Sequence, residues 1–324
     1  MSDQTVLYLN RGDLESLNLG VPDIIELLRH AFSEHAAGRA TMPGKCWIVR
    51  SADSFFCAMP CYIPALGAAG CKWNSGNPGA PARGLPYVQG LYILSDAETG
   101  APLAIMNSAW ITAARTGAAT GLAARVLARE GASTVAILGC GVQGRSNLEA
   151  LRLAVPTVAA VRAYDVSPEA ADRLVADAST RLGLDARRAA DPREAVIGAD
   201  IIITAGPNIR GPHPIELEWL APGALGVSVN RDSFWAPGAV SAMDTIVADD
   251  VQQIDDMKRD GFFTAVREVS AELGHVVAGR APGRRRADDR ILVFNLGVAL
   301  EDLATAVELY RRAQARGIGT VLAV

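Results

Sequence analysis

The spacing of apolar residues changes character along the chain. Residues 22–38 repeat apolar positions at helical spacing, which predicts an amphipathic helix near the N-terminus. Residues 42–106 hold short apolar runs separated by glycine, proline and asparagine, a texture typical of β-strands. These runs are 46–49, 55–59, 88–94 and 102–106. From Thr134 onwards, strand-length runs alternate with helical segments, which predicts a parallel sheet with helices.

Two longer helical segments complete the outline. Residues 112–129 are alanine-rich and predict a helix that leads into the alternating region, and 296–316 predict a long helix after it. A chain of 324 residues is too long for one ordinary core. We therefore predict an α/β protein of two domains. A Rossmann dinucleotide-binding domain would span 119–295, and a β-rich α+β domain for substrate binding and dimerisation would combine both chain ends, 1–118 and 296–324.

The alternating region opens with a glycine motif. The apolar run from Thr134 leads into Gly139-Cys-Gly-Val-Gln-Gly144, which is G-x-G-x-x-G where a strand would turn into a helix. Gly139 permits the tight turn, Gly141 lets the backbone approach a pyrophosphate, and Gly144 lets the helix pack against the strand. The helix then points unpaired N–H groups at the phosphates. By itself the spacing is weak evidence, because a chain with 31 glycines produces it by chance.

An acidic residue at the end of the next strand strengthens the motif. Asp165 lies at the end of the apolar run 158–166, about 20 residues after Gly144. At this place in the motif a carboxylate binds the ribose hydroxyls of adenosine. The same carboxylate repels a 2′-phosphate, and Val166-Ser-Pro168 offers no arginine to receive one, although Arg162 lies nearby in sequence. NAD is the predicted cofactor and NADP the less favoured one. A glycine-rich helix start with no nucleotide is the alternative.

Composition narrows the classes of partner. Half of the residues are hydrophobic, a fifth are charged and the net charge is −4, which gives no electrostatic reason to expect nucleic acid or an anionic membrane. We find neither a secretory signal nor an apolar run of membrane-spanning length, so a cytoplasmic protein is expected. The five cysteines and four histidines lack the spacing of metal ligands, and no metal site is predicted.

Three cations stand in settings that favour carboxylate binding. Lys72 lies between a cysteine and a tryptophan, an apolar setting that a lysine rarely enters without a partner. Arg115 begins the alanine-rich helix, and Thr116 and a glycine after it allow a close approach, so its guanidinium can bind a carboxylate bidentately. Lys45 is the third candidate. For each of them the alternative is a surface charge whose stem covers apolar neighbours.

Asp232 differs in kind from these cations. It follows the apolar run 225–229 and so falls near the carboxyl end of a strand, where the substrate of a dinucleotide enzyme lies. A carboxylate there can bind a substrate amine or exchange a proton with it. The alternative is a helix N-cap for the segment that follows.

Together these runs resemble the ornithine cyclodeaminase/μ-crystallin family along nearly the whole chain. The segment around Arg115 and the glycine loop are its most specific parts. The matching runs are Met59-Pro60, Gly70-Cys-Lys72, Gly84-Leu-Pro86, Thr99-Gly-Ala-Pro-Leu103, Thr112-Ala-Ala-Arg-Thr-Gly-Ala118, Gly139-Cys-Gly-Val-Gln143, Gly198-Ala-Asp200, Gly279-Arg280, Glu301-Asp-Leu-Ala304 and Gly317-Ile-Gly-Thr320.

The resemblance implies a homodimer that associates through β-structure of its substrate domains, with a nicotinamide cofactor in the Rossmann domain. It implies carboxylate recognition by Lys45, Lys72 and Arg115, and binding of the substrate nitrogen by Asp232. Met59 is counted with the substrate-binding residues, and Lys72 and Asp232 are the expected catalytic residues. The expected cofactor-binding residues are Arg115, Thr116, Gly139, Gly141, Val142, Gln143, Gly144, Asp165, Thr204, Gly206, Val229, Asn230 and Asn295.

Departures from the family pattern bear on the reaction. The cyclodeaminases carry a glutamate two residues before the Met-Pro pair, and this chain has Cys57 there, which cannot act as a carboxylate. Lys45 replaces an arginine, and Asp232-Ser-Phe-Trp-Ala236 replaces Asp-x-Pro-Gly-Lys. Phe294-Asn-Leu-Gly297 stands where a lysine or aspartate followed by serine is more usual. These departures disfavour a lyase cycle, while the residues expected for hydride transfer at a Cα–N bond are all present.

We therefore predict an NAD-dependent oxidoreductase, of amino-acid dehydrogenase or imine reductase type, that acts at the Cα–N bond of an amino acid or its imine. The three cations would hold the carboxylate and place Cα against the nicotinamide, and Asp232 would exchange the amine proton. Two alternatives stay open: a cyclodeaminase that releases ammonia with catalytic NAD, and a non-catalytic small-molecule binder. Phe234 and Trp235 indicate a substrate side chain bulkier or less charged than ornithine, or else belong to the core.

Overall fold

The computed structural model of the chain describes residues 4–51, 54–208 and 211–324. The chain divides into two compact units, which we call the first unit (Met1–Arg115 with Val298–Val324) and the second unit (Thr116–Gly297). The mixed α/β fold class is confirmed. The predicted domains, 1–118 with 296–324 and 119–295, stay a prediction, because compactness does not show that each part folds by itself.

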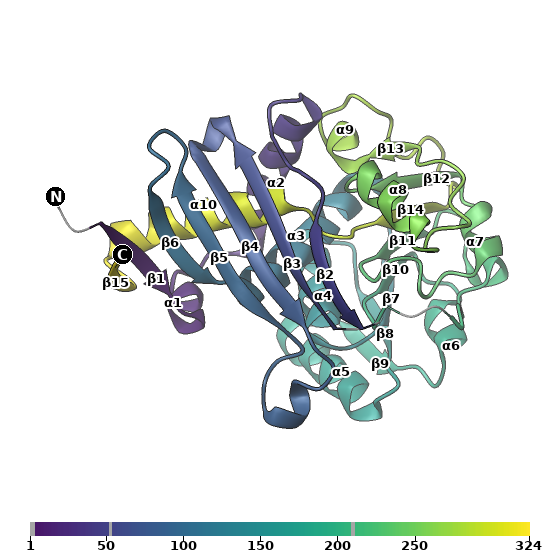
Figure 1. Ribbon diagram of the computed structural model, residues 1–324. Helices are drawn as coiled ribbons and strands as arrows, with labels where there is room; N and C mark the ends of the chain where they lie inside the picture. Colours follow the sequence, from purple (N-terminus) through teal and green to yellow (C-terminus); the bar gives the residue numbers. More distant parts are fainter. Residues whose placement is uncertain (1–3, 52–53, 209–210) are drawn as a thin grey trace. The chain divides into compact units, whose positions relative to one another are not determined.

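The first unit contains a seven-stranded sheet with the strand order β15-β1-β6-β5-β4-β3-β2 (Figure 1). Neighbouring strands are antiparallel except β1 and β6, which are parallel. The strands are β1 (Thr5–Leu9), β2 (Cys46–Ser51), β3 (Ser54–Ile63), β4 (Ala68–Gly76), β5 (Val88–Asp96), β6 (Pro102–Asn107) and β15 (Thr320–Ala323).

Helices pack on one face of this sheet. The long helix α10 (Ala299–Arg316) contacts β3, β4 and β5 and also packs against α2 (Val21–Ala36) (Figure 1). The short helix α1 (Arg11–Ser16) starts with a capping box in which Asn10 and Asp13 bond each other's backbone N–H groups. The predicted helices at 22–38 and 296–316 are confirmed as α2 and α10, and α10 begins at Ala299.

The strands of the first sheet alternate between a covered and an exposed face. In β5, Tyr92 is fully buried, while its neighbours Leu91 and Ile93 are each 44% exposed. In β4, Lys72 is buried and Trp73 is 43% exposed. Because side chains alternate along a strand, the face opposite α10 carries exposed apolar side chains.

The second unit contains an eight-stranded sheet in which every neighbouring pair is parallel. Its order is β13-β12-β14-β11-β10-β7-β8-β9, and its central strands are almost wholly buried, as parallel strands between two helical layers are. The strands are β7 (Thr134–Leu138), β8 (Ala160–Tyr164), β9 (Asp185–Arg188), β10 (Ile201–Thr204), β11 (Leu225–Ser228), β12 (Thr245–Ala248), β13 (Ala271–Glu272) and β14 (Ile291–Phe294).

The remaining helices belong to the second unit, apart from α3, which begins in the first unit and continues into the second. Their bounds follow local signals: α5 is capped by the Ser167 side chain, and its C-cap Gly183 has φ +65°. The helices are α3 (Ser108–Leu127), α4 (Val142–Ala154), α5 (Pro168–Leu182), α6 (Pro192–Val196), α7 (Pro237–Ser241), α8 (Val251–Arg259) and α9 (Leu273–Val277).

Candidate functional site

The glycine loop of the second unit is shaped by close backbone packing. Gly139 follows β7 with φ +101°, and a Cβ atom there would lie 2.5 Å from the backbone nitrogen of Gly206. A Cβ atom on Gly144 would collide with the carbonyl oxygen of Gly139. At Gly141, by contrast, no heavy atom of the described residues beyond its own chain neighbours lies within 4 Å of the Cβ position. The backbone at Gly141 is therefore open to a group from outside the chain, as a pyrophosphate requires.

Helix α4 begins directly after this open glycine. Gly141 is its N-cap and supplies no side-chain hydrogen bond, so N–H groups of the first turn are left for another acceptor. Val142 in this turn is 61% exposed, and Gln143 is half-buried. Since the helix has 13 residues, it also presents the positive end of a macrodipole there. Both features fit the phosphates of a dinucleotide.

Asp165 lies at the end of β8 and contacts the glycine loop. Its carboxylate accepts hydrogen bonds from the backbone N–H of Cys140 at 2.7 Å and from that of Ser167 at 2.9 Å. Asp165 thus fixes the loop beside which the adenosine ribose would bind. Arg162, whose position in the sequence weakened the preference for NAD, donates to the carbonyl oxygen of Ile197.

Other residues expected to bind the cofactor lie where the central parallel strands end. The Thr204 hydroxyl donates to Asn230 Oδ1 at 2.8 Å, and the Val229 N–H donates to the Thr204 carbonyl oxygen at 3.0 Å. Asn295, after β14, donates from Nδ2 to the Thr120 hydroxyl of α3 at 3.1 Å. The carboxyl ends of β10, β11 and β14 meet at one edge of the sheet, where nucleotide ligands bind in such folds.

The aromatic pair after Asp232 has two different environments. Trp235 is 1% exposed, and its indole N–H donates to the Thr204 hydroxyl at 3.3 Å, so it belongs to the core of the second unit. Phe234 is half-buried, and its ring packs on Gly206, where a Cβ atom would lie 2.6 Å from the ring carbon Cζ. A side chain at position 206 would therefore require the Phe234 ring to move.

In the first unit, Lys72 is the charged member of an apolar row across the sheet. Met59, Lys72, Tyr92 and Met106 pair in register on β3, β4, β5 and β6, and each is at most 4% exposed. Lys45 precedes Cys46, which pairs with the residue before Met59. The structure therefore brings Lys45, Met59 and Lys72 to one part of the sheet.

Two buried acids of α10 meet the buried cations. The Lys72 ammonium lies 2.8 Å from Asp302 Oδ2 and 3.3 Å from the Thr112 hydroxyl. Arg115 of α3 donates from Nη1 to Glu301 Oε2 at 2.5 Å and from Nε to Asp302 Oδ1 at 3.2 Å. All four charged side chains are at most 6% exposed. Lys72 and Arg115 are therefore not surface charges, and together with the two acids they form what we call the cation–acid cluster.

Burial dominates the electrostatics of this cluster. It lowers the pKa of Lys72 to about 8, the nearby Arg115 charge acts in the same direction, and Asp302 opposes both. Burial also raises the pKa of Glu301, against the opposing effect of Arg115. The Cys57 thiol is buried on β3, and its pKa rises to about 11 although Lys45 and Lys72 act to lower it. Cys57 is therefore a neutral thiol at pH 7.

Asp232 lies in the second unit, in a turn after β11. Its Oδ2 accepts the backbone N–H of Phe263 at 2.7 Å, whereas its buried Oδ1 has no hydrogen-bond partner within the part of the chain that the structure describes. The residue lines a cavity of about 200 Å³ together with His213, Trp235 and Thr264. Because a buried carboxylate oxygen seeks a donor, Asp232 is suited to bind an N–H group.

The sequence prediction missed the acids of the cation–acid cluster. Glu301 and Asp302 occur within a matching run of the family resemblance, but they were not assigned to a site. A usable signal exists: two adjacent acids interrupt the buried residues of α10, where only a cation can compensate them. Tyr92, the fully buried neighbour of Lys72 in the row, was missed as well.

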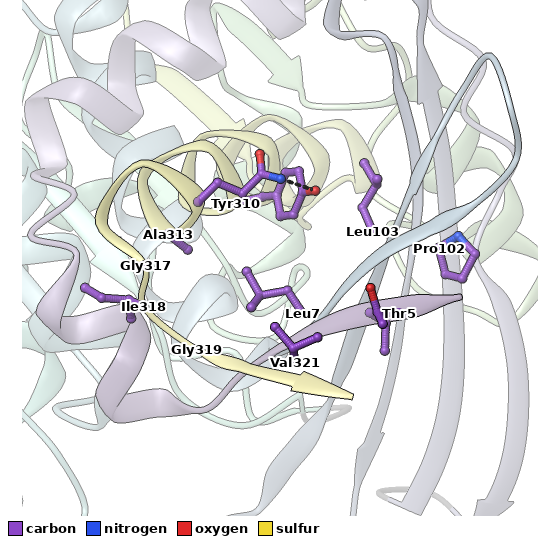
Figure 2. A pocket seen from close by; sticks show the side chains of 12 residues that line it. Thr5, Leu7, Pro102, Leu103, Tyr310, Ala313, Gly317, Ile318, Gly319 and Val321 are labelled. Atoms are coloured by element: carbon purple, nitrogen blue, oxygen red, sulfur yellow. Dashed lines mark hydrogen bonds between the residues drawn. The ribbon is translucent and has the colours of Figure 1, made fainter. Parts of the chain in front are cut away.

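Another cavity lies elsewhere in the first unit. It has a volume of about 410 Å³ and is lined by residues of β1, β6, α10 and β15 (Figure 2). Its polar side chains are those of Thr5, Tyr310 and Gln314, and the Tyr310 hydroxyl accepts a hydrogen bond from Gln314 at 2.6 Å. None of the predicted site residues lines this cavity.

Within residues 4–51, 54–208 and 211–324, no helix is long and apolar enough to cross a membrane. Within the same ranges, no group of three or more histidine, cysteine or acidic side chains is placed to hold a metal ion.

Comparisons with known proteins give one consistent result. A family model described as the ornithine cyclodeaminase/mu-crystallin family matches residues 6–317. An alanine dehydrogenase of Archaeoglobus fulgidus is 34% identical over 97% of this chain and 97% of its own length.

Two solved structures share the whole fold. A Δ1-pyrroline-2-carboxylate reductase of Thermococcus litoralis, in complex with NADH and L-proline, aligns with a TM-score of 0.88 and 33% identity over 97% of this chain and 99% of its own. An archaeal alanine dehydrogenase dimer with bound NAD aligns with a TM-score of 0.89 and 33% identity over 98% and 99%.

Proposed function

Because the chain belongs to the ornithine cyclodeaminase/mu-crystallin family, we propose that it is an NAD-dependent oxidoreductase that acts at the Cα–N bond of an amino acid or the corresponding imine. The observation that carries this proposal is the buried pair of cations, Lys72 and Arg115, in a chain that also has an open dinucleotide cradle at Gly141. The solved relatives with bound NAD and NADH support the cofactor, and the one with L-proline supports the substrate class.

The residues present fit a dinucleotide. Gly139, Gly141 and Gly144 would accommodate its pyrophosphate at the start of α4, and Asp165 would accept the ribose hydroxyls. The rest of the dinucleotide would be surrounded by Thr116 of α3 and by Thr204, Gly206, Val229, Asn230 and Asn295. When bound, NAD would supply the acceptor or donor of a hydride at the substrate Cα.

The cations of the first unit would hold the substrate carboxylate. The Arg115 guanidinium is suited to a planar carboxylate, and the Lys72 ammonium adds a second charge within the same buried cluster. Lys45, half-buried at the same part of the sheet, would supply a third charge. Since the formal charges of the two buried cations are already balanced by Glu301 and Asp302, Lys45 would compensate the incoming carboxylate.

Asp232 would handle the substrate nitrogen. Its buried Oδ1, which has no hydrogen-bond partner among the described residues, would accept a hydrogen bond from an amine. A carboxylate can also take the proton that the nitrogen loses when an imine forms. Cys57 bears on the alternative reaction. Cyclodeamination needs a group that manages water or protons at the imine, and a thiol with a pKa of about 11 is a poor base at neutral pH. This favours net oxidoreduction over ammonia-releasing cyclisation.

We propose a homodimer formed through the exposed apolar face of the first sheet. Trp73, Leu91 and Ile93 on this face are each more than 40% exposed, and a second copy would bury them. An archaeal relative that aligns over 98% of this chain is described as a dimer. We also propose a cytoplasmic location, which the five free cysteines support because reducing compartments keep thiols unpaired.

A substrate screen tests the proposed reaction. Amino acids would be supplied with NAD, and keto acids with amines or cyclic imines would be supplied with NADH, while absorbance at 340 nm is followed. We expect cofactor turnover with at least one α-amino acid or its imine, and no turnover with the matching amine that lacks the carboxylate. Turnover of the decarboxylated analogue at a similar rate would contradict the role given to the cations.

A further inference from the structure

Asp302 contacts both buried cations of the cluster at once. Its two oxygens lie 2.9 Å and 2.8 Å from the Lys72 ammonium, and Oδ1 also lies 3.2 Å from Arg115 Nε. We propose that Asp302 is the positioning residue of the substrate site: it keeps Lys72 protonated and holds Lys72 and Arg115 where both can bind a substrate carboxylate. This rests on the proposed function, which assigns the two cations to that carboxylate.

The geometry gives Asp302 a role that Glu301 does not share. Glu301 contacts Arg115, whereas Asp302 lies between Arg115 and Lys72 and fixes one relative to the other. Asp302 is fully buried, in the first turn of an 18-residue helix, where the positive end of the helix dipole stabilises a carboxylate. The Asp302 carboxylate is therefore held in place by the backbone of α10, unlike the carboxylate of a flexible side chain on the surface.

Charge gives the second reason. A lysine ammonium that is excluded from water tends to lose its proton unless an anion faces it. Burial and the Arg115 charge already lower the pKa of Lys72 to about 8, and Asp302 is the acid that opposes them by both charge and hydrogen bonding. Without the Asp302 charge this pKa would fall further, and Lys72 would be neutral over more of the physiological range.

The groups around Lys72 come from several elements, and each bears on its protonation. Arg115 and Lys45 disfavour the charged form, while Asp302 favours it. The other neighbours are acids or neutral groups that face it from α10, α3, β3 and β5, and they are Glu301, Thr112, Cys57 and Tyr92. Among these residues, Asp302 is the ion-pair partner at contact distance.

The test compares Asp302→Asn with the wild type and with a control, Glu308→Gln. Glu308 lies on the same helix and pairs with Arg312 outside the cluster. KM and kcat for the amino acid would be measured from pH 6 to 10, together with the Kd of NADH and the Tm. In the wild type, KM should rise above about pH 8 as Lys72 loses its proton. In Asp302→Asn this rise should begin about two pH units lower, with KM at pH 7 raised about tenfold.

A folded Asp302→Asn variant with an unchanged KM profile would overturn the proposal, as would a loss in kcat alone, which indicates a merely structural role. Glu308→Gln should show the same KM profile as the wild type. Titration of the substrate amine affects all variants equally, so it does not contribute to the difference between them. If Asp302→Asn does not fold, Asp302→Glu replaces it in the test. This variant keeps the charge and moves the carboxylate by one methylene, so the proposal requires a raised KM at pH 7 and an unchanged KM would overturn it.

The two proposals fail separately. If the wild type turns over no amino acid or imine, the proposed function fails. Calorimetric titration of NADH-loaded wild type and Asp302→Asn with L-alanine or L-proline then tests the positioning role, which requires weaker binding to the variant.

Discussion

A buried lysine and a buried arginine, side by side, need a compensating partner inside the protein. Removing one member of such a cluster leaves an uncompensated charge, which destabilises a protein by about 3–5 kcal/mol. Here Glu301 and Asp302 provide the compensation for Lys72 and Arg115. Apolar residues of similar volume can replace a buried ion pair without loss of stability, so the proposed role in carboxylate binding would account for four buried charges at this place.

Arg115 carries the clearest prediction at the residue scale. Arg115→Ala should lower kcat/KM for the amino acid by the equivalent of about 2–5 kcal/mol, because a buried charged hydrogen-bonding partner of the carboxylate is lost. Steady-state kinetics check this, with Arg125→Ala, an exposed arginine of the same helix, as the control. Where Arg115→Ala does not fold, Arg115→Lys keeps the charge without the planar fork. Unchanged kcat/KM in a folded variant would remove Arg115 from the substrate site.

Single residues were predictable where the signal is local. The setting of Lys72 between apolar neighbours and of Arg115 in an alanine-rich helix identified both as unusual cations. Their acids were not predictable by the same means, because Lys72 and Asp302 lie 230 residues apart in the sequence and only the fold pairs them. The sequence likewise could not show which residue of the aromatic pair belongs to the core, and the structure shows that it is Trp235.

At the scale of elements, the strand–loop–helix unit at 134–154 is the proposed binding site of the dinucleotide pyrophosphate. Its three glycines have different constraints, and these constraints can be separated by substitution. A side chain on Gly144 meets the carbonyl oxygen of Gly139, whereas a side chain on Gly141 meets open space. We therefore expect folding to depend on Gly144, and pyrophosphate binding to depend on Gly141.

Gly141→Ala should fold with a Tm close to that of the wild type and bind NADH at least tenfold more weakly, because its methyl group occupies the approach to the phosphates. Fluorescence titration and thermal unfolding without cofactor check the two parts. Gly144→Ala should instead lower the Tm of the cofactor-free protein. Equal NADH affinity in Gly141→Ala and the wild type would place the phosphates elsewhere.

Asp165 predicts which dinucleotide is preferred. Its carboxylate lies at the end of β8, and a 2′-phosphate beside it would be repelled, so NADH should bind more tightly than NADPH. Asp165→Asn should narrow the difference in Kd, since the amide oxygen still accepts the Cys140 N–H but carries no charge. Tighter binding of NADPH by the wild type would show that another residue overrides Asp165.

Strong periodicity and motif made most elements predictable. β2, β3, β5 and β6 follow the predicted apolar runs, and α10 follows the predicted long helix. β4 was not predicted, because Trp73 is the one large apolar residue of Ala68–Gly76, among glycines, alanines, a cysteine and polar residues. The segment gains its strand pairing from β3 and β5. β14 was also missed, although its four residues are apolar and fully buried.

For the whole molecule, the exposed face of the first sheet has the strongest consequence. Its apolar side chains lie opposite the face that α10 covers, so a monomer would leave them in water. Association of two such faces around a two-fold axis removes both surfaces at once. The sheet would then have helices on one side and a second sheet on the other.

Charge on this face should disrupt the dimer. Trp73→Glu with Ile93→Glu places two carboxylates on the exposed face, and burying them unpaired is unfavourable. Sedimentation velocity should give a dimer for the wild type and a monomer for the double variant. Leu153→Glu, at a comparably exposed position of α4, should remain a dimer. A wild type that sediments as a monomer at micromolar concentration would contradict the proposed homodimer.

The central claim is that the protein carries out net oxidoreduction at a Cα–N bond, and the stoichiometry of cofactor and product tests it most directly. The substrate identified by the screen would be incubated with excess NAD, while NADH, ammonia and the organic product are quantified together. Because the buried Cys57 thiol supplies no base for a cyclodeaminase cycle, the account predicts one NADH for each molecule of product. Ammonia and a cyclic product formed with catalytic NAD, and with no net NADH, would contradict it.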